Sequence, residues 1–185
     1  MRVPLIDAWR TFVDTKLSPY YLDHQLDRMA FREEKLFDYH VDMVYSINQT
    51  GVKAAFKECA IHCPNYRRHK LEILSPDDCV RIIREDLQIN IALKQIRAAY
   101  AFSKQIVTNE QEEKNILQYE RMNYNEFLEF IARIADIWFE GTEMEELPLY
   151  RKVEYFLERL LKLVDLQVMR QQTIIEEFSD SDVDD

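Results

Sequence analysis

Four residues in one short segment could bind a metal ion: Cys59, His62, Cys63 and His69. Structural zinc sites usually present thiolate and imidazole ligands as paired C-x2-4-C and H-x3-5-H spacings on turns. Here Cys59 and Cys63 share one face of a predicted helix, and His69 follows in a loop. Because that pairing is missing, two buried thiols and a loop histidine are favoured over a zinc site at Cys59, Cys63 and His69.

Nucleophilic catalysis has one candidate, Cys63. A catalytic cysteine needs a base and an electropositive setting, and a basic loop does follow it: Arg67, Arg68, His69 and Lys70. Neither an orienting Asn nor a Gly-rich oxyanion loop accompanies them, so we predict no enzyme and no cofactor. The basic loop suits docking to an acidic partner, such as a microtubule surface, or to the chain's own acidic tail, and the sequence does not separate these two.

The elements that would position such groups are helices. The chain has only two glycines, Gly51 and Gly141, whereas tight hairpins and phosphate-binding loops depend on Gly for positive φ. A β-sandwich or β-barrel is therefore disfavoured, and a P-loop or dinucleotide fingerprint is ruled out. The hydrophobic fraction of 47% and charged fraction of 31% are typical of a folded soluble protein.

Charge and cysteine content narrow the possible partners and the cellular compartment. The net charge is −10, and six acidic residues lie in the last ten: Glu176, Glu177, Asp180, Asp182, Asp184 and Asp185. The rest is only mildly acidic, which disfavours a nucleic-acid partner. No apolar stretch of about 20 residues predicts a membrane span, and no secretory signal is evident. Three cysteines imply no disulfide framework, so a cytoplasmic setting is predicted.

Apolar spacing and capping signals predict a series of helices. We expect helices over 4–15, from 19 to 47 with a break near 31–35, and over 52–63 after a stop at 48–51. Further helices are expected to about residue 86 after the N-cap Ser75, over 90–106, to about residue 140 after the N-cap Asn123, and from 148. The acidic tail, 176–185, is expected to be disordered.

A six-residue pattern occurs twice, at 74–79 (LSPDDC) and 122–127 (MNYNEF). Each copy reads apolar, N-cap, any residue, polar, acidic, apolar, and each continues as an amphipathic helix. Each is also preceded, across a polar segment, by another predicted helix. The sequence therefore predicts two helix–loop–helix units.

This repeat resembles the EF-hand superfamily over residues 52–139. In that family the eighth loop position is apolar, the ninth caps the exit helix, and the twelfth is an acidic ligand. The resemblance places Leu74 and Met122 at the eighth positions, where they would pair the two loops in a short β-bridge. It places Asp78 and Glu126 at the twelfth, so that the first loop is 67–78 and the second loop is 115–126.

The calcium ligands that this resemblance requires are missing. A working loop supplies oxygen ligands at positions 1, 3 and 5 and a Gly at position 6. The two loops instead hold Arg67, His69, Leu71 and Glu72, and Asn115, Leu117, Tyr119 and Glu120. We therefore expect no calcium binding, with Asp78 and Glu126 acting as helix caps.

Residues 122–136 also resemble degenerate helix–loop–helix modules of axonemal and other cytoskeletal proteins. That resemblance implies a ciliary, flagellar or cytoskeletal location. It also implies an amphipathic helix or a cytoskeletal component as the protein partner.

EF-hand-like pairs bind a partner helix in an apolar groove. We expect this groove to be the partner-binding surface, together with Arg67, Arg68 and Lys70 of the basic loop. Its residues are Leu74, Ile82, Ile83, Met122, Phe127, Phe130, Ile131 and Ile134. The last predicted helix has a wide apolar face, which favours its filling the groove in cis over leaving it open to a partner.

Two serines in the acidic tail, Ser179 and Ser181, each have an acidic residue three positions later. This spacing resembles acidophilic kinase sites, where phosphate would deepen the negative charge. The alternative is a solubilising tail without regulation.

The sequence thus predicts an all-α helical bundle built around a degenerate EF-hand-like pair. Its parts are an N-terminal helical segment (1–50), the pair (51–140), a C-terminal helix (141–175) and the tail (176–185). The predicted function is non-enzymatic, calcium-independent protein–protein interaction, or a structural subunit. The alternative is a metal-dependent module, with zinc at Cys59, Cys63 and His69 or calcium at Asp78 and Glu126.

Overall fold

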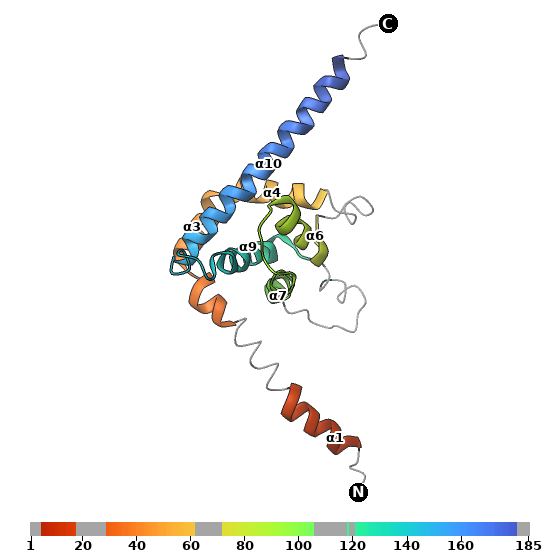
Figure 1. Cartoon of the computed structure of the whole chain (residues 1–185), viewed down its shortest axis with the longest axis vertical. Coiled ribbons are helices and arrows are strands. Elements are labelled where there is room, and N and C mark those ends of the chain that lie inside the picture. The colour runs from red at the N-terminus through yellow and green to blue at the C-terminus, as the bar shows by residue number, and fades with distance from the viewer. Residues whose placement is uncertain (1–4, 18–28, 62–71, 106–117, 119–120, 181–185) are drawn as a thin grey trace. The chain divides into compact units, whose positions relative to one another are not determined.

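A computed structural model describes residues 5–17, 29–61, 72–105, 118 and 121–180. The chain divides into two compact units, Met1–Asp38 and Tyr39–Asp185. The division falls after residue 38, not after residue 50, because residues 39–50 pack within the larger unit. The regular elements of the described residues are helices (Figure 1), so the predicted all-α class is confirmed.

The smaller unit contains α1 (Leu5–Phe12), which continues as the π-helical segment η1 (Val13–Leu17). The helix predicted over 4–15 is therefore present. A second π-helical segment, η2 (Arg32–Leu36), ends where the Phe37 N–H donates to the Arg32 carbonyl at 2.8 Å. This irregularity coincides with the predicted break at 31–35. Residues 18–28 of the predicted helix lie outside the described part.

The larger unit is arranged around its central helix, α9 (Tyr124–Phe139). Its elements are α3 (Tyr39–Ile47), α4 (Gln49–Ile61), α6 (Pro76–Arg81), η3 (Ile82–Asp86), α7 (Leu93–Ser103), α9 (Tyr124–Phe139) and α10 (Leu149–Asp180). α9 contacts both α7 and α10, and α10 also packs against α3 and α4 (Figure 1). No described helix is long and apolar enough to cross a membrane.

Buried charges on α9 are all paired with opposite charges. The Arg133 guanidinium lies 2.9 Å from Glu129 on the same helix, and the Lys152 ammonium of α10 lies 2.7 Å from Asp136. A third pair joins Glu126 to Lys104 at 2.6 Å. Such pairing is required because an isolated buried charge is strongly destabilising, and it allows α9 to carry charge inside the core.

The predicted stop at 48–51 is shorter in the structure. Only Asn48 separates the two helices; its backbone and side-chain N–H groups donate to the Val44 carbonyl at 3.2 and 2.9 Å. Gly51 lies inside α4, where an added Cβ would come within 3.0 Å of Leu161 on α10. The glycine therefore permits close packing between α4 and α10, and it does not end a helix.

The predictions for the C-terminal region are partly corrected. The chain leaves α9 through Gly141, whose φ of 71° suits a residue without a Cβ. α10 begins directly after Pro148, as predicted, but it continues to Asp180. Residues 176–180, expected to be disordered, are therefore helical, because the helix runs on past its apolar part. Residues 181–185 lie outside the described part.

Candidate functional site at the paired loops

The two loops are joined by an isolated antiparallel β-bridge between Leu74 and Met122. The Met122 N–H donates to the Leu74 carbonyl at 2.8 Å, and the Leu74 N–H donates in return at 3.3 Å. Both side chains are completely buried. The Tyr100 hydroxyl of α7 also donates to the Leu74 carbonyl, at 3.3 Å. The pairing expected between the two eighth positions is therefore present.

A capping box, here called the first box, starts α6. The Asp78 N–H donates to the Ser75 hydroxyl oxygen at 3.2 Å. In return, Asp78 Oδ2 accepts from the Ser75 N–H at 2.9 Å and from the Ser75 hydroxyl at 2.6 Å. Both directions of hydrogen bonding are thus satisfied locally, and Asp78 is a cap, as predicted.

The second box starts α9 in the same way. The Glu126 N–H donates to Asn123 Oδ1 at 3.0 Å, and Glu126 Oε2 accepts from the Asn123 N–H at 2.9 Å. Glu126 has two further donors from the end of α7. The Lys104 ammonium donates to Oε2 at 2.6 Å, and the Gln105 N–H donates to Oε1 at 2.9 Å. The second carboxylate therefore holds two segments together.

Lys104 is the residue at this site that sequence reasoning missed. It is the C-cap of α7 and is only 4% exposed. Its ammonium also donates to the Arg121 carbonyl and lies 5.8 Å from the centre of the Tyr100 ring. One signal pointed to such a cation. An acidic residue that becomes buried, as Glu126 does, needs a positive partner.

The eight apolar residues predicted to line a partner-binding groove are core residues instead. None of them is more than 2% exposed: Leu74, Ile82, Ile83, Met122, Phe127, Phe130, Ile131 and Ile134. α10 packs along α9, with Val153, Phe156, Leu157 and Leu160 buried. The last helix thus packs in cis, as favoured, and the contact surface suggested by the sequence is covered.

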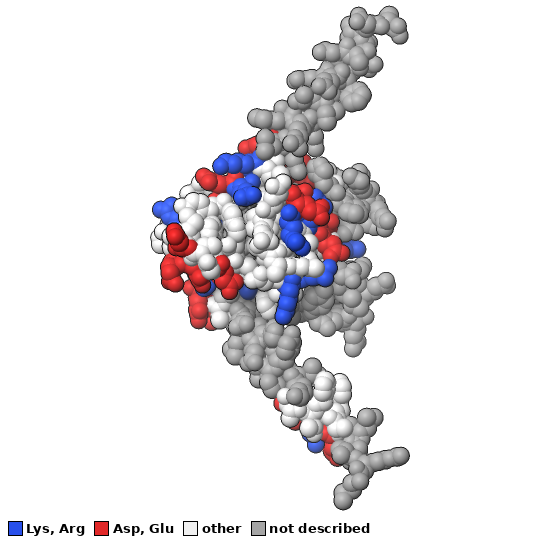
Figure 2. All heavy atoms as spheres, in the orientation of Figure 1, with Lys and Arg blue, Asp and Glu red and all other residues white. Residues whose placement is uncertain are grey.

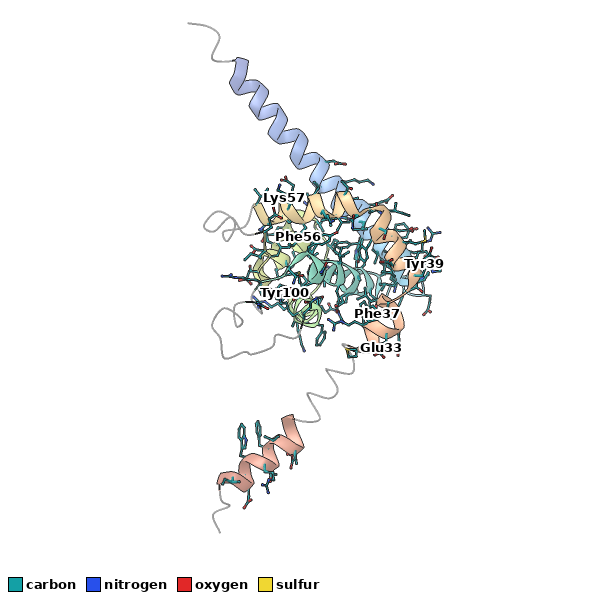
Figure 3. The ribbon with its side chains drawn as sticks, turned by 180° about the vertical axis from the view of Figure 1, so that it is seen from behind. Glu33, Phe37, Tyr39, Phe56, Lys57 and Tyr100 are labelled. Carbon is teal, nitrogen blue, oxygen red and sulfur yellow. The ribbon has the colours of Figure 1, made fainter. Side chains whose placement is uncertain are left out.

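Within the larger unit, an exposed apolar row lies on α3 instead. Tyr39, Met43 and Ile47 are 70%, 40% and 75% exposed and are spaced four residues apart. They form one row along the helix, here called the α3 ridge, turned away from the buried Val41 and Val44. Figure 3 labels Tyr39 on this helix and Phe56 on α4. A face of the larger unit combines charged and uncharged surface (Figure 2).

A shallow hollow of about 400 Å³ lies between the end of α9 and the middle of α10. Its lining is mainly aromatic and apolar, from Trp138, Phe139, Met144 and Tyr155, and also includes the charged residues Glu158, Arg159 and Lys162. The guanidinium of Arg159, one of these three, lies 5.8 Å from the centre of the Trp138 ring. The hollow therefore already contains a cation of the chain itself.

Tyr45 of α3 and Tyr124 at the start of α9 both have raised pKa values. Burial, and then the charges of Tyr124 and Glu129, raise the pKa of Tyr45, whose hydroxyl donates to the Leu128 carbonyl at 2.7 Å. Burial also raises the pKa of Tyr124. Both phenols are therefore held in the neutral form.

The remaining predicted site residues are only partly described. Cys59 is buried on α4, and the described residues contain no group of three or more metal-ligating side chains. His62, Cys63 and the basic loop (Arg67, Arg68, His69 and Lys70) lie outside the described part, as do positions 1, 3 and 5 of both loops. Ser179 lies within α10, and Ser181 lies outside the described part.

Comparison of the chain with protein-family models, curated proteins and solved structures found no match.

Proposed function

We propose that this chain is a calcium-independent protein-interaction module, acting as an adaptor or structural subunit without catalysis. Its scaffold is a degenerate EF-hand-like pair. Three features support that scaffold: the Leu74–Met122 bridge, and a capping box beginning one residue after each bridge residue. The two copies of the sequence pattern thus have the same local geometry.

Calcium independence is supported by the hydrogen bonds of the two acids. Asp78 Oδ2 accepts from the Ser75 backbone and hydroxyl. Both oxygens of Glu126 accept from protein donors. A calcium ion takes six to eight oxygen ligands, so it would have to displace these donors without enough ligands to replace them.

The α3 ridge is the observation that carries the interaction role. Residues spaced four apart form the row that packs into the groove of another helix. Three such side chains, at 70%, 40% and 75% exposure, leave that row uncovered on the larger unit. Side chains at this spacing match an amphipathic helix, and we propose that the occupant is an amphipathic helix of a partner protein.

The test is site-specific photocrosslinking from Met43 in the full chain. Asp42 is the matched control position, because it is exposed on the same helix but lies about 100° away around it. Crosslinking to one helical segment of a partner is expected from position 43 and not from position 42, with equal yield in calcium and in chelator. Equal yields from both positions, or crosslinking to a second copy of this chain, would overturn the proposal.

The competing metal-dependent function has its own test. Calcium is titrated calorimetrically into chelator-treated protein after the purified protein has been analysed for bound metals. No calcium heat and no bound zinc are expected. Micromolar calcium binding would make the protein a sensor, and one zinc per chain would shift the function to Cys59, Cys63 and His69.

A ciliary or cytoskeletal assembly is the proposed location of this module. It rests on the resemblance of residues 122–136 to axonemal modules. Fractionation of ciliated cells expressing a tagged full chain tests it, with enrichment in the axonemal fraction expected. Uniform recovery in the cytosolic fraction would contradict this location and leave calcium independence intact.

A further inference from the structure

The hollow between α9 and α10 combines an aromatic lining with one charged face of α10. The residues that α10 contributes are Tyr155, Glu158, Arg159 and Lys162. Because they follow one another at helical spacing, they share one side of the helix. Tyr155 is 43% exposed, and the charged side chains are also exposed. This face of α10 is therefore accessible to a ligand.

The rest of the lining is apolar: Trp138, Phe139 and Met144. The Phe139 ring centre lies 4.8 Å from that of Trp138 and 5.9 Å from that of Tyr155. Aromatic rings and a methionine side chain favour contact with a large apolar or aromatic group. Small-molecule sites normally bury most of their ligand, so a shallow hollow suits a single side chain presented by a peptide.

The position of Arg159 indicates the charge of that peptide. Its Nε donates to the Leu87 carbonyl at 2.9 Å, and its guanidinium lies 5.8 Å from the centre of the Trp138 ring. These contacts hold the guanidinium in place and cover a ring face that a cationic ligand would use. Of the five N–H donors of a guanidinium, only the one on Nε is used by another described residue. The others can receive a carboxylate.

The remaining charges also favour an acidic ligand. Among the described residues Glu158 is the only acid that lines the hollow, and with Arg159 and Lys162 it gives the lining a net charge of +1. The glutamates of the connection 140–147 are not part of the lining. The whole chain carries a net charge of −10, so a positive lining is a local contrast that selects for negative partners.

We propose that this hollow binds a partner peptide in which acidic residues flank a large apolar side chain. The apolar side chain contacts the rings of Trp138, Phe139 and Tyr155. One acidic neighbour pairs with the Arg159 guanidinium, and Lys162 attracts the other. The hollow contains no residue of α3, so it is a binding site in addition to the α3 ridge and does not depend on it.

The test is titration of synthetic peptides into the full chain carrying Trp9→Phe. Trp9 is 62% exposed, and its replacement leaves Trp138 as the only tryptophan. The indole N–H signal of Trp138 in a two-dimensional NMR spectrum then reports on the hollow. The probes are Ac-Ser-Glu-Phe-Glu-Ser-NH2 and two counterparts with Lys-Phe-Lys or Glu-Ser-Glu at the centre.

The Glu-Phe-Glu peptide should shift the Trp138 signal saturably, with a dissociation constant of about 1 mM, as for one anchored side chain in a flexible peptide. The Lys-Phe-Lys and Glu-Ser-Glu peptides should bind at least about tenfold more weakly, because one has the wrong charge and the other lacks the apolar group. No shift with Glu-Phe-Glu at about 10 mM, or equal binding of Lys-Phe-Lys, would overturn the proposal.

Lys162→Glu tests the charge of the hollow at an exposed position. It should weaken binding of Glu-Phe-Glu about fivefold, in the range of an exposed ion pair, and strengthen binding of Lys-Phe-Lys. Lys94→Glu is the matched control, because it makes the same charge change at an exposed lysine of α7 that does not line the hollow. Equal weakening by both variants would mean that only the overall charge matters, against the proposal.

Arg159→Ala tests the positioned guanidinium. It should weaken binding of Glu-Phe-Glu about tenfold, as for a lost charge-assisted hydrogen bond. It should also strengthen binding of Lys-Phe-Lys, since the Trp138 ring face becomes free. Unchanged binding of Glu-Phe-Glu would contradict the role of Arg159. If this variant does not fold, Arg159→Lys keeps the charge without the planar donors and should still weaken binding.

These measurements leave crosslinking from Met43 unaffected. Failure of the hollow to bind the acidic peptide is therefore distinguishable from failure of the proposed function at the α3 ridge.

Discussion

The two capping boxes have the same local geometry but different surroundings. In the first box the donors to Asp78 both come from Ser75, three residues away. In the second box Glu126 also accepts from Lys104 and Gln105, more than twenty residues earlier in the chain. The first acid therefore starts a helix, whereas the second also ties the end of α7 to the start of α9.

This difference shows how one sequence pattern can have two energetic roles. A cap made by neutral local donors contributes about 1 kcal/mol. A buried carboxylate paired with an ammonium becomes much more costly to remove, because the partner charge is then left unpaired. Among the described residues no cation pairs with Asp78, so the stability of the two boxes should differ.

The largest expected effect is the loss of the Glu126 carboxylate. Glu126→Ala should lower the free energy of unfolding by about 4 kcal/mol, since it leaves the Lys104 ammonium buried without an anion. Asp78→Ala should cost only about 1 to 2 kcal/mol, the range for a lost cap. Urea denaturation with matched m-values measures both. Equal losses would show that the two boxes are equivalent.

The two residues of the bridge should contribute equally to the free energy of unfolding, whereas the acids of the two boxes should not. Leu74→Ala and Met122→Ala each empty a completely buried position, and each should cost about 3 kcal/mol by the same denaturation measurement. Leu93→Ala is the control, because Leu93 is an exposed leucine at the start of α7 and should change stability by less than about 0.5 kcal/mol. A large loss at only one bridge residue would contradict a shared core.

The two N-cap residues should also contribute equally to the free energy of unfolding, but by a smaller amount. Ser75→Ala and Asn123→Ala each remove the acceptor of one backbone N–H, at about 1 kcal/mol each in chemical denaturation. Glycine at the same positions should cost only a few tenths of a kcal/mol. If Asn123→Ala costs several times more than Ser75→Ala, the second box depends on Asn123 as well as on Lys104.

A loss similar to that of a cap residue at neutral pH is expected for Tyr45, whose effect also depends on pH. Tyr45→Phe loses the hydrogen bond to the Leu128 carbonyl in α9, the exit helix of the second loop, at about 1 kcal/mol. Because the pKa of Tyr45 is raised in the folded state, its stabilising contribution is complete below the unfolded pKa and falls as pH rises above it. At pH 11 the loss relative to pH 8 is about 1.4 kcal/mol.

Denaturation of the wild type and Tyr45→Phe at both pH values tests the direction of this pH dependence. The variant should lose less stability on alkalinisation, with the raised pKa of Tyr124 accounting for part of what remains. A larger alkaline loss in the variant would contradict the assignment.

Local rules predicted the helix starts well. The residues of each capping box are three positions apart, so Ser75 and Asn123 identified the starts of α6 and α9 directly. The end of η3 at Asp86 and the start of α10 after Pro148 also agree. The errors lie where packing overrides local preference: Gly51 suggested a helix stop, yet it allows α4 to approach Leu161.

The candidate surface was predicted less well, for a related reason. Apolar residues on η3 and α9 were expected to line a groove. Apolar spacing does not distinguish a face covered by the chain's own helix from one open to a partner. α10 covers α9, and within the larger unit an exposed apolar row lies on α3. Lys104 was missed because its partner Glu126 lies on another element.

By itself, the sequence determined the all-α class, the capped starts of α6 and α9, and the pairing of the apolar residues Leu74 and Met122. These follow from backbone propensity and from contacts within a few residues. Only the tertiary structure decided that α10 covers the pair, that the α3 ridge stays exposed, and that Lys104 meets Glu126. Each of these depends on which surfaces meet when distant helices exclude water together, and that is a property of the whole packed core.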